Sequence, residues 1–128
     1  MSDTTTASEP TTTVDRYLAA WTEPDAARRL DLVEQLWEPD GRLIDPPLAA
    51  EGRTGISDLF AAFQAQFPGH TFRRTSAVDA HHEQFRFAWE LVAPDGSVAL
   101  AGLDVGETGA EGRLRRITGF FGDLATGC

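Results

Sequence analysis

The chain has 128 residues but only one cysteine, one tyrosine and no lysine. The cysteine, Cys128, is the last residue, so no disulfide can form within the chain, and a thiol on a fraying terminus is a poor nucleophile. The absence of lysine excludes a Schiff base and a P-loop, because both need a lysine amine. No apolar run approaches the roughly 20 residues that a membrane-spanning helix needs.

The charge and composition describe a globular domain with a surplus of acid. The formal charge is −9, from 20 acidic residues and 11 basic ones, all of them arginine. This surplus argues against nucleic acid or a membrane surface as a partner. Hydrophobic residues make up 41% and charged residues 24%, which is typical of a soluble domain. With a single cysteine, the expected compartment is the reducing cytoplasm.

The first residues differ from the rest of the chain. The stretch MSDTTTASEPTTT is polar and acidic, with neither a basic start nor an apolar core, so it does not have the pattern of a secretory signal. It cannot bury enough apolar surface to offset its ordering entropy, which predicts a disordered leader over residues 1–12. Residues 13–126 are predicted to form one domain.

Three segments have the spacing of amphipathic helices. The first covers about residues 13–23. The second follows Asp25, a suitable N-cap, and runs to Trp37. The third covers residues 54–67. The apolar stripe of the first helix consists of Val14, Tyr17, Leu18 and Trp21.

Short strands are predicted around and after these helices. The stretch EPDG at 38–41 predicts a turn, and a short strand follows at 42–45, before a loop rich in proline and glycine. Beyond the third helix the spacing changes to alternation, with hairpin turns at APDGS and TGAEG. These four later strands cover 71–80, 83–92, 98–107 and 113–124.

This order of elements predicts an α+β fold. A strongly bent sheet wrapped over the helices would have an apolar interior that is open at one end. Such an interior is a natural pocket for a small molecule.

Asp45 ends the short first strand and is followed by Pro46 and Pro47. Taken alone, an aspartate before proline is more often a turn residue. However, Asp45 follows Leu43 by two residues, so both side chains point to the same side of the strand. If Leu43 faces the core, so does the carboxylate, and the prolines then fix the backbone beside it.

Asp104 stands in the stretch GLDV, in a strand whose two faces are both apolar and which is therefore expected to be covered on both sides. A buried carboxylate must be paired, hydrogen-bonded or protonated. One interpretation pairs it with an arginine such as Arg73, Arg74 or Arg86. The other makes it a functional carboxyl with a perturbed pKa. The residues alone leave both open.

Tyr17 and the histidines are weaker candidates. An aromatic residue on an amphipathic stripe is usually part of the core, but a buried phenol needs a hydrogen-bond partner, and a carboxylate is one such partner. His81 and His82 are adjacent, so an extended strand would send them to opposite faces. His70 follows a turn. No spacing typical of metal ligands is present, so neither a metal nor another cofactor is predicted.

Five stretches of the chain together resemble a known superfamily: RYLAAW, LVEQLWEPDGRLIDPP, GRTGISDLFAAF, GLDV and GFFGDL. They run from about Val14 to Leu124. Over this range the chain resembles the NTF2-like superfamily, and within it the SnoaL-like proteins and the ketosteroid isomerases.

The resemblance implies a conical α+β fold, with three N-terminal helices packed in a strongly curved, mostly antiparallel sheet, and a homodimer. It implies proton transfer next to a carbonyl group of a hydrophobic small molecule. By this resemblance Asp45 is the base, and Tyr17 and Asp104 donate hydrogen bonds to the enolate oxygen. The residues expected to contact the substrate are Trp21, Trp37, Phe60, Phe63, His70, Phe87, Trp89 and Phe120.

Three other functions stay open at this stage. A SnoaL-like polyketide cyclase would use aspartate acid/base catalysis in an aldol closure. An epoxide hydrolase of the limonene type would need an arginine between two aspartates, which Arg73 or Arg74 would have to supply. A non-catalytic module would bind a ligand or dimerise without chemistry. If the protein is an enzyme, we expect the Tyr17 hydroxyl and the carboxyls of Asp45 and Asp104 to share one cavity.

Overall fold

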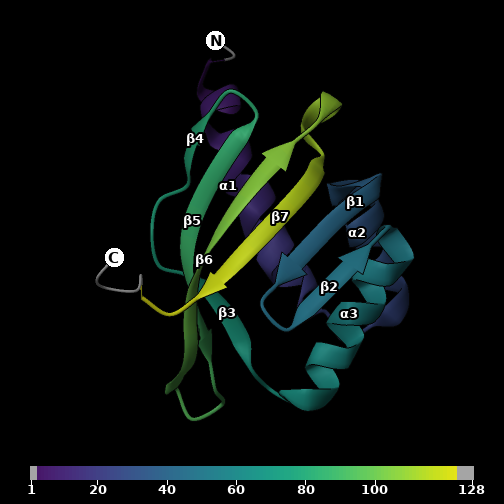
Figure 1. Ribbon diagram of the computed structural model, residues 1–128, viewed down its shortest axis with the longest axis vertical. Helices are drawn as coiled ribbons and strands as arrows, with labels where there is room; N and C mark the ends of the chain where they lie inside the picture. The colour runs from purple at the N-terminus through teal and green to yellow at the C-terminus, as the bar shows by residue number, and fades with distance from the viewer. Residues whose placement is uncertain (1–2, 124–128) are drawn as a thin grey trace.

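The structure is a computed structural model that describes residues 3–123, with side chains from residue 10 onward. Within this part of the chain, helices and strands alternate first and strands dominate afterwards (Figure 1). The helices are α1 (Asp3–Ala20), α2 (Ala26–Leu36), α3 (Arg53–Gln66) and the short 3-10 helix η1 (Ala110–Gly112). The strands are β1 (Trp37–Asp45), β2 (Leu48–Glu51), β3 (Thr71–Arg74), β4 (Asp79–His81), β5 (Gln84–Val92), β6 (Val98–Thr108) and β7 (Leu114–Phe121).

The strands form one mixed sheet in the order β2-β1-β7-β6-β5-β3, and β4 pairs with β5 beside β3. Only the pairing of β1 with β7 is parallel within these strands. Shifts of register interrupt the pairings of β1 with β7, β5 with β6 and β6 with β7, and such bulges bend a sheet. Figure 1 shows α1 behind the curved strands and α3 beside β2. The predicted α+β cone of three helices and a curved, mostly antiparallel sheet is confirmed.

The helix α1 begins earlier than the sequence predicted. Its stripe is buried as expected, with Val14 and Tyr17 each 1% exposed, but the helix starts at Asp3 rather than near residue 13 and contains Pro10. The predicted leader, residues 1–12, is therefore helical from Asp3 onward, and its first two residues lie outside the described range. The second helix is capped as predicted, because the Asp25 side chain accepts a hydrogen bond from the Arg28 amide.

The strand β1 replaces the turn predicted at residues 38–41. Pro39 and Asp40 are exposed, and the register of β1 against β7 shifts between Trp37 and Arg42, which accommodates the proline in the strand. The strand β2 was not predicted at all. It folds back on β1 through the two prolines, with Leu48 paired to Asp45, so part of the loop expected there is a hairpin.

On the inner face of the sheet, large aromatic side chains of β5 lie opposite small residues of β6. On β5, Phe85 and Trp89 lie opposite Gly106 and Gly102 of β6. A Cβ on either glycine would overlap the ring across from it, so each ring lies flat over the neighbouring strand. Phe87, between them, lies opposite Asp104.

The outer face of β6 is open, which corrects the prediction that β6 is covered on both sides. Val105 is 37% exposed and Phe120 on β7 is 54% exposed. The apolar outer residues follow from the sequence, but which faces are covered depends on where the helices pack. None of the described helices is both long and apolar enough to cross a membrane.

Candidate active site

A cavity of about 270 Å³ lies between α1, α3 and the inner face of the sheet. Its walls are mostly aromatic and aliphatic. The side chains with polar atoms are few, and three of them, Tyr17, Asp45 and Asp104, come from α1, β1 and β6. The three residues that the sequence singled out therefore line the same cavity, although 28 and 59 positions separate them along the chain.

Asp45 faces the interior, as its spacing from Leu43 predicted. Leu43 is 0% exposed and Asp45 is 7% exposed, at the end of β1 where the hairpin turns. Pro46 and Pro47 form this turn, and their fixed φ angles restrict the backbone beside the carboxyl group. Burial raises the pKa of Asp45 to about 6. At pH 7 this carboxyl is still mainly ionised, and it is a stronger base than an exposed aspartate.

Asp104 is the more deeply buried carboxyl, with 4% exposure. The indole Nε1 of Trp89 donates a hydrogen bond of 2.9 Å to its Oδ1. Burial, followed by the nearby charge of Asp45, raises the pKa of Asp104 to about 8, against the smaller lowering effect of hydrogen bonding from Trp89 and Tyr17. At pH 7 Asp104 is therefore mainly protonated and can donate a hydrogen bond.

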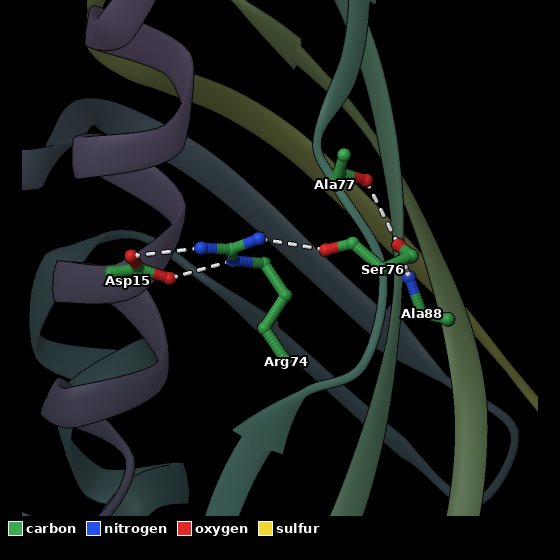
Figure 2. A network of polar contacts seen from close by, with 5 residues as sticks. All are labelled: Asp15, Arg74, Ser76, Ala77 and Ala88. Carbon is green, nitrogen blue, oxygen red and sulfur yellow. Dashed lines mark hydrogen bonds and ion pairs between the residues drawn. The ribbon is translucent and has the colours of Figure 1, made fainter.

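The arginines offered as partners for Asp104 are engaged elsewhere. Figure 2 shows Arg74 between α1 and the loop after β3, where it donates to both carboxylate oxygens of Asp15, at 2.8 and 3.2 Å, and to the Ser76 carbonyl at 2.7 Å. The same network continues from the Ser76 hydroxyl, which accepts from the Ala88 amide. Arg73 pairs with Glu90, and Arg86 pairs with Asp79. The interpretation of Asp104 as one half of an arginine ion pair is therefore wrong.

Tyr17 lies at the centre of an aromatic cluster. Its ring meets Trp21, Trp37, Phe60 and Phe87 edge to face, with centroids 6.1 to 6.5 Å apart. Burial raises the pKa of its phenol well above the usual value of 10, and the charges of Asp104 and Asp45 raise it further. The phenol is thus held protonated, so it can act only as a neutral donor at physiological pH.

Comparison with known protein families shows which family this chain belongs to. The family model of the SnoaL-like domain matches residues 14–121. The chain belongs to the SnoaL-like family. This confirms the resemblance seen in the sequence and accounts for the whole of the curved sheet and the helices that line the cavity. Among curated proteins, none matches the sequence.

Solved structures agree with this SnoaL-like assignment. A protein of the SnoaL-like family from Agrobacterium tumefaciens C58, provisionally named an isomerase, is 37% identical, with a TM-score of 0.86 over 91% of this chain and 99% of that one. A candidate polyketide cyclase from Sinorhizobium meliloti has a TM-score of 0.66 at 14% identity, over 84% and 92% of the two chains. A candidate SnoaL-like polyketide cyclase from Jannaschia sp. CCS1 has a TM-score of 0.64 at 18% identity, over 87% and 85%. The last two support the fold alone.

The cavity of this SnoaL-like domain contains three of the eight aromatic and histidine residues expected to contact a substrate: Trp21, Phe63 and Trp89. The other five lie outside its lining. Trp37, Phe60 and Phe87 are fully buried in the core behind the cavity wall. His70 follows α3 and packs its ring edge to face against Phe67.

Phe120 is the clearest correction among these five, because it points to the outer face and its neighbour Phe121 lines the cavity instead. The strand β7 has an irregular register between its pairings at Leu114 and Arg116, so counting alternate residues from the start of the strand gives the wrong face. Beyond that irregularity, Ile117 and Gly119 are buried, and Phe121 continues their side of the strand.

Several cavity residues of the SnoaL-like domain were not singled out from the sequence. Phe72 stacks on Phe63 with centroids 5.2 Å apart, and Gln66 adds a neutral amide at the wall. Alternation within TFRR and helical spacing within α3 could have indicated them. Besides Phe121, the remaining unpredicted lining residues are Leu18, Pro47, Leu48, Leu59, Ala62, Phe67, Leu91 and Leu100.

The histidine pair of the SnoaL-like domain differs from its prediction. His82 has a φ of 53°, in the left-handed region, and this turn brings the Nδ1 atoms of His81 and His82 to 3.1 Å rather than sending the rings to opposite faces. In residues 3–123, no group of three or more histidine, cysteine, aspartate or glutamate side chains is arranged to hold a metal ion.

Proposed function

We propose that this SnoaL-like domain is an enzyme that transfers a proton at the carbon next to a carbonyl group of a small, neutral, hydrophobic compound. The reaction would be an isomerisation or a ring closure. The observation that supports this most strongly is that two buried carboxyls and a buried phenol line one apolar cavity. The provisional name of the structural neighbour that is 37% identical, an isomerase, is consistent with it.

In this proposal the three polar residues divide the chemistry. Asp45, mainly ionised at pH 7, removes a proton from the carbon, and the electrons of that C–H bond move onto the carbonyl oxygen. Asp104 and Tyr17, both protonated, donate hydrogen bonds to the enolate oxygen that forms. In an isomerisation Asp45 returns the proton to another carbon. In a ring closure the enolate carbon attacks a second carbonyl of the same molecule, and the new alkoxide takes up the proton that Asp45 removed, which restores the ionised Asp45.

The walls of the cavity favour a neutral substrate of limited size. No arginine lines the cavity among the described residues, so a carboxylate or phosphate on the substrate would have no countercharge. A volume of about 270 Å³ lies just below the usual range of pockets that bury drug-sized ligands, which favours a small compound.

Two other functions are weaker. An epoxide hydrolase of the limonene type needs an arginine beside its aspartates, and Arg73 and Arg74 are paired with Glu90 and Asp15 outside the cavity. A ligand-binding module would use the same apolar walls, but it would gain nothing from two buried carboxyls, which cost free energy to desolvate.

The test measures removal of a proton from carbon directly. We expect the protein to accelerate deuterium exchange at the activated CH₂ groups of 2-tetralone, a neutral two-ring ketone, in D₂O, followed by proton NMR. Asp45→Asn should lower this rate at least about 100-fold, the usual range for loss of a general base, while 2-tetralone still quenches tryptophan fluorescence. Asp58→Asn, an exposed change on α3, is the control.

The outcome decides between enzyme and binding module. If Asp45→Asn exchanges deuterium as fast as the wild type, Asp45 is not the base. If 2-tetralone binds but the wild type does not accelerate exchange above buffer, the binding module is favoured.

A further inference from the structure

Asp45, Gly119 and Asp104 lie side by side on three neighbouring strands. Asp104 of β6 is paired with Gly119 of β7, and the pairing of Ile44 with Thr118 brings Asp45 of β1 beside the same glycine. All three are buried. The two carboxyls therefore approach each other across a residue that has no side chain.

The space above Gly119 is occupied by the carboxyl groups themselves. A Cβ on Gly119 would overlap Oδ1 of Asp45, and it would lie 2.8 Å from Oδ1 of Asp104 and 3.0 Å from Cγ of Asp45. The two Oδ1 atoms thus lie within about 5 Å of each other, a range over which one carboxylate charge opposes ionisation of the other. Any larger residue at position 119 would force them apart.

We infer that Gly119 is a positioning residue that holds Asp45 and Asp104 as a coupled pair, whose two carboxyls together carry one proton at neutral pH. The catalytic role of the pair rests on the proposed function, but the coupling between the two carboxyls does not depend on it. The pair would then carry one negative charge through the reaction. When Asp45 takes a proton from the substrate, that charge moves to the enolate oxygen, and Asp104 remains protonated beside it.

The surroundings leave the two carboxyls as each other's main charged neighbour. From α1 they are faced by the neutral Tyr17, from β5 by Phe87 and Trp89, and from β7 by Gly119. The polar cavity residue of α3 is the uncharged Gln66. In the described part of the chain, no cation lies at the cavity wall to neutralise the second charge. Full ionisation of both carboxyls is therefore disfavoured until high pH.

Trp89 orients the carboxyl group of Asp104. Its ring lies over Gly102, where a Cβ would come 2.8 Å from Cε2 of the indole, and this contact brings Nε1 to Oδ1 of Asp104. The carbonyl oxygen of a protonated carboxyl is a better acceptor than its hydroxyl oxygen, so this bond favours the proton on Oδ2 over Oδ1. Gly102 and Gly119 thus give the pair its orientation and its separation.

The experiment titrates the carboxyl carbons of the full chain labelled with ¹³C-aspartate, followed by NMR, with Asp104 assigned from Asp104→Asn. Coupling is the change in the Asp104 midpoint caused by Asp45→Asn. In the wild-type background we expect this change to lower the midpoint by at least about one pH unit, because the opposing charge is removed.

Gly119→Ala tests the position of the glycine. In this background the effect of Asp45→Asn on the Asp104 midpoint should fall to less than half, because the new methyl group pushes the carboxyls apart. Gly55→Ala is the matched control, since a Cβ at Gly55 in α3 would meet nothing within 4 Å, and it should leave the coupling unchanged.

Two results would overturn the inference. One is an Asp104 midpoint that does not change in Asp45→Asn, and this arm remains decisive even if Gly119→Ala does not fold. The other is equal coupling in the Gly119→Ala and Gly55→Ala backgrounds. Because these titrations need no substrate, a coupled pair in a protein that does not exchange 2-tetralone would reject the proposed function and leave the pair standing.

Discussion

Asp45 and Asp104 lower the stability of the fold at the pH where they would work. Burial raises the pKa values of these carboxyls from the ordinary 3.8 to about 6 and about 8. The folded chain therefore holds these protons more tightly than the unfolded chain does. Their contribution to stability is complete below pH 4, and it is lost as pH rises through 6 and then through 8.

We expect the free energy of unfolding to fall between pH 5 and pH 9 by an amount on the order of a few kcal/mol, measured by urea unfolding at fixed ionic strength. Asp104→Asn should remove most of this slope and be more stable than the wild type at pH 9, because asparagine still accepts from Trp89 but cannot ionise. Asp58→Asn should retain the slope. A wild-type stability that does not fall over this range would contradict the raised pKa values.

The residues of the candidate site were predictable to the extent that local pattern determines burial. Asp45 could be placed by its spacing from Leu43, and Asp104 by the apolar strand around it. Gly119 could not be recognised, because its importance depends on the pairing of β1 with β7. The strand β7 begins 69 residues after β1 ends. Phe120 was assigned to the wrong face, because the irregular register of β7 reverses the alternation.

At the scale of elements, helix stripes and hairpin strands were predictable, whereas elements made by long-range pairing were not. The stripe of α1 and the cap of α2 depend on residues a few positions apart. The hairpin of β1 and β2 has prolines where tight hairpins usually have glycine or asparagine, so the sequence indicated a loop. In the first part of β1 only Trp37 pairs with β7, and the turn residues at 38–41, such as Pro39 and Asp40, lie within the register shift that follows it.

The contact of α1 with the edge of the sheet depends on Arg74. Its guanidinium joins Asp15 of α1 to the loop after β3 (Figure 2), and Asp15 precedes Tyr17 by two residues. Both partners are partly exposed, with 24% of the Arg74 side chain and 50% of the Asp15 side chain accessible, so the ion pair itself stabilises the fold little. The contact instead fixes the position of α1, and therefore the position of the Tyr17 hydroxyl on that helix.

We expect a double-mutant cycle of Arg74→Met and Asp15→Asn, measured by urea unfolding, to give a coupling energy of about 0.5–1 kcal/mol. Arg74→Lys should lose most of this coupling, because a lysine cannot reproduce the two-pronged contact. In the exposed pair of Arg86 and Asp79, the matched control, we expect a smaller value. A coupling near zero for Arg74 and Asp15 would show that packing alone holds α1 in place.

At the scale of the whole molecule, the apolar outer face of the sheet needs an explanation. Leu103 of β6 and Phe120 of β7 are paired neighbours there, and Val105 extends the patch (Figure 1 shows the strands β5, β6 and β7 side by side). On β5, Arg86 and Glu90 lie on either side of the same region, paired with Val105 and Ala101. Exposed apolar residues that gather on one face commonly mark an interaction site.

We propose that a second copy of this chain covers this face. A two-fold axis that crosses the strands near Leu103 would bring Arg86 of one copy opposite Glu90 of the other, where each would join the ion pair that the other already makes with Asp79 or Arg73. Because the patch is exposed in the single chain, a charge introduced there should separate the copies without unfolding them.

We therefore expect the wild type to have the mass of a dimer by size-exclusion chromatography with light scattering at tens of micromolar, and Val105→Asp to have the mass of a monomer with unchanged circular dichroism. Ala27→Asp is the control, because Ala27 is exposed in the first turn of α2, a helix that packs against α1, α3 and β1 and not on the outer face of β6. It adds the same charge away from the patch, and its mass should stay that of the wild type. A monomeric wild type, or equal dissociation by both variants, would mean that the outer face does not join two copies.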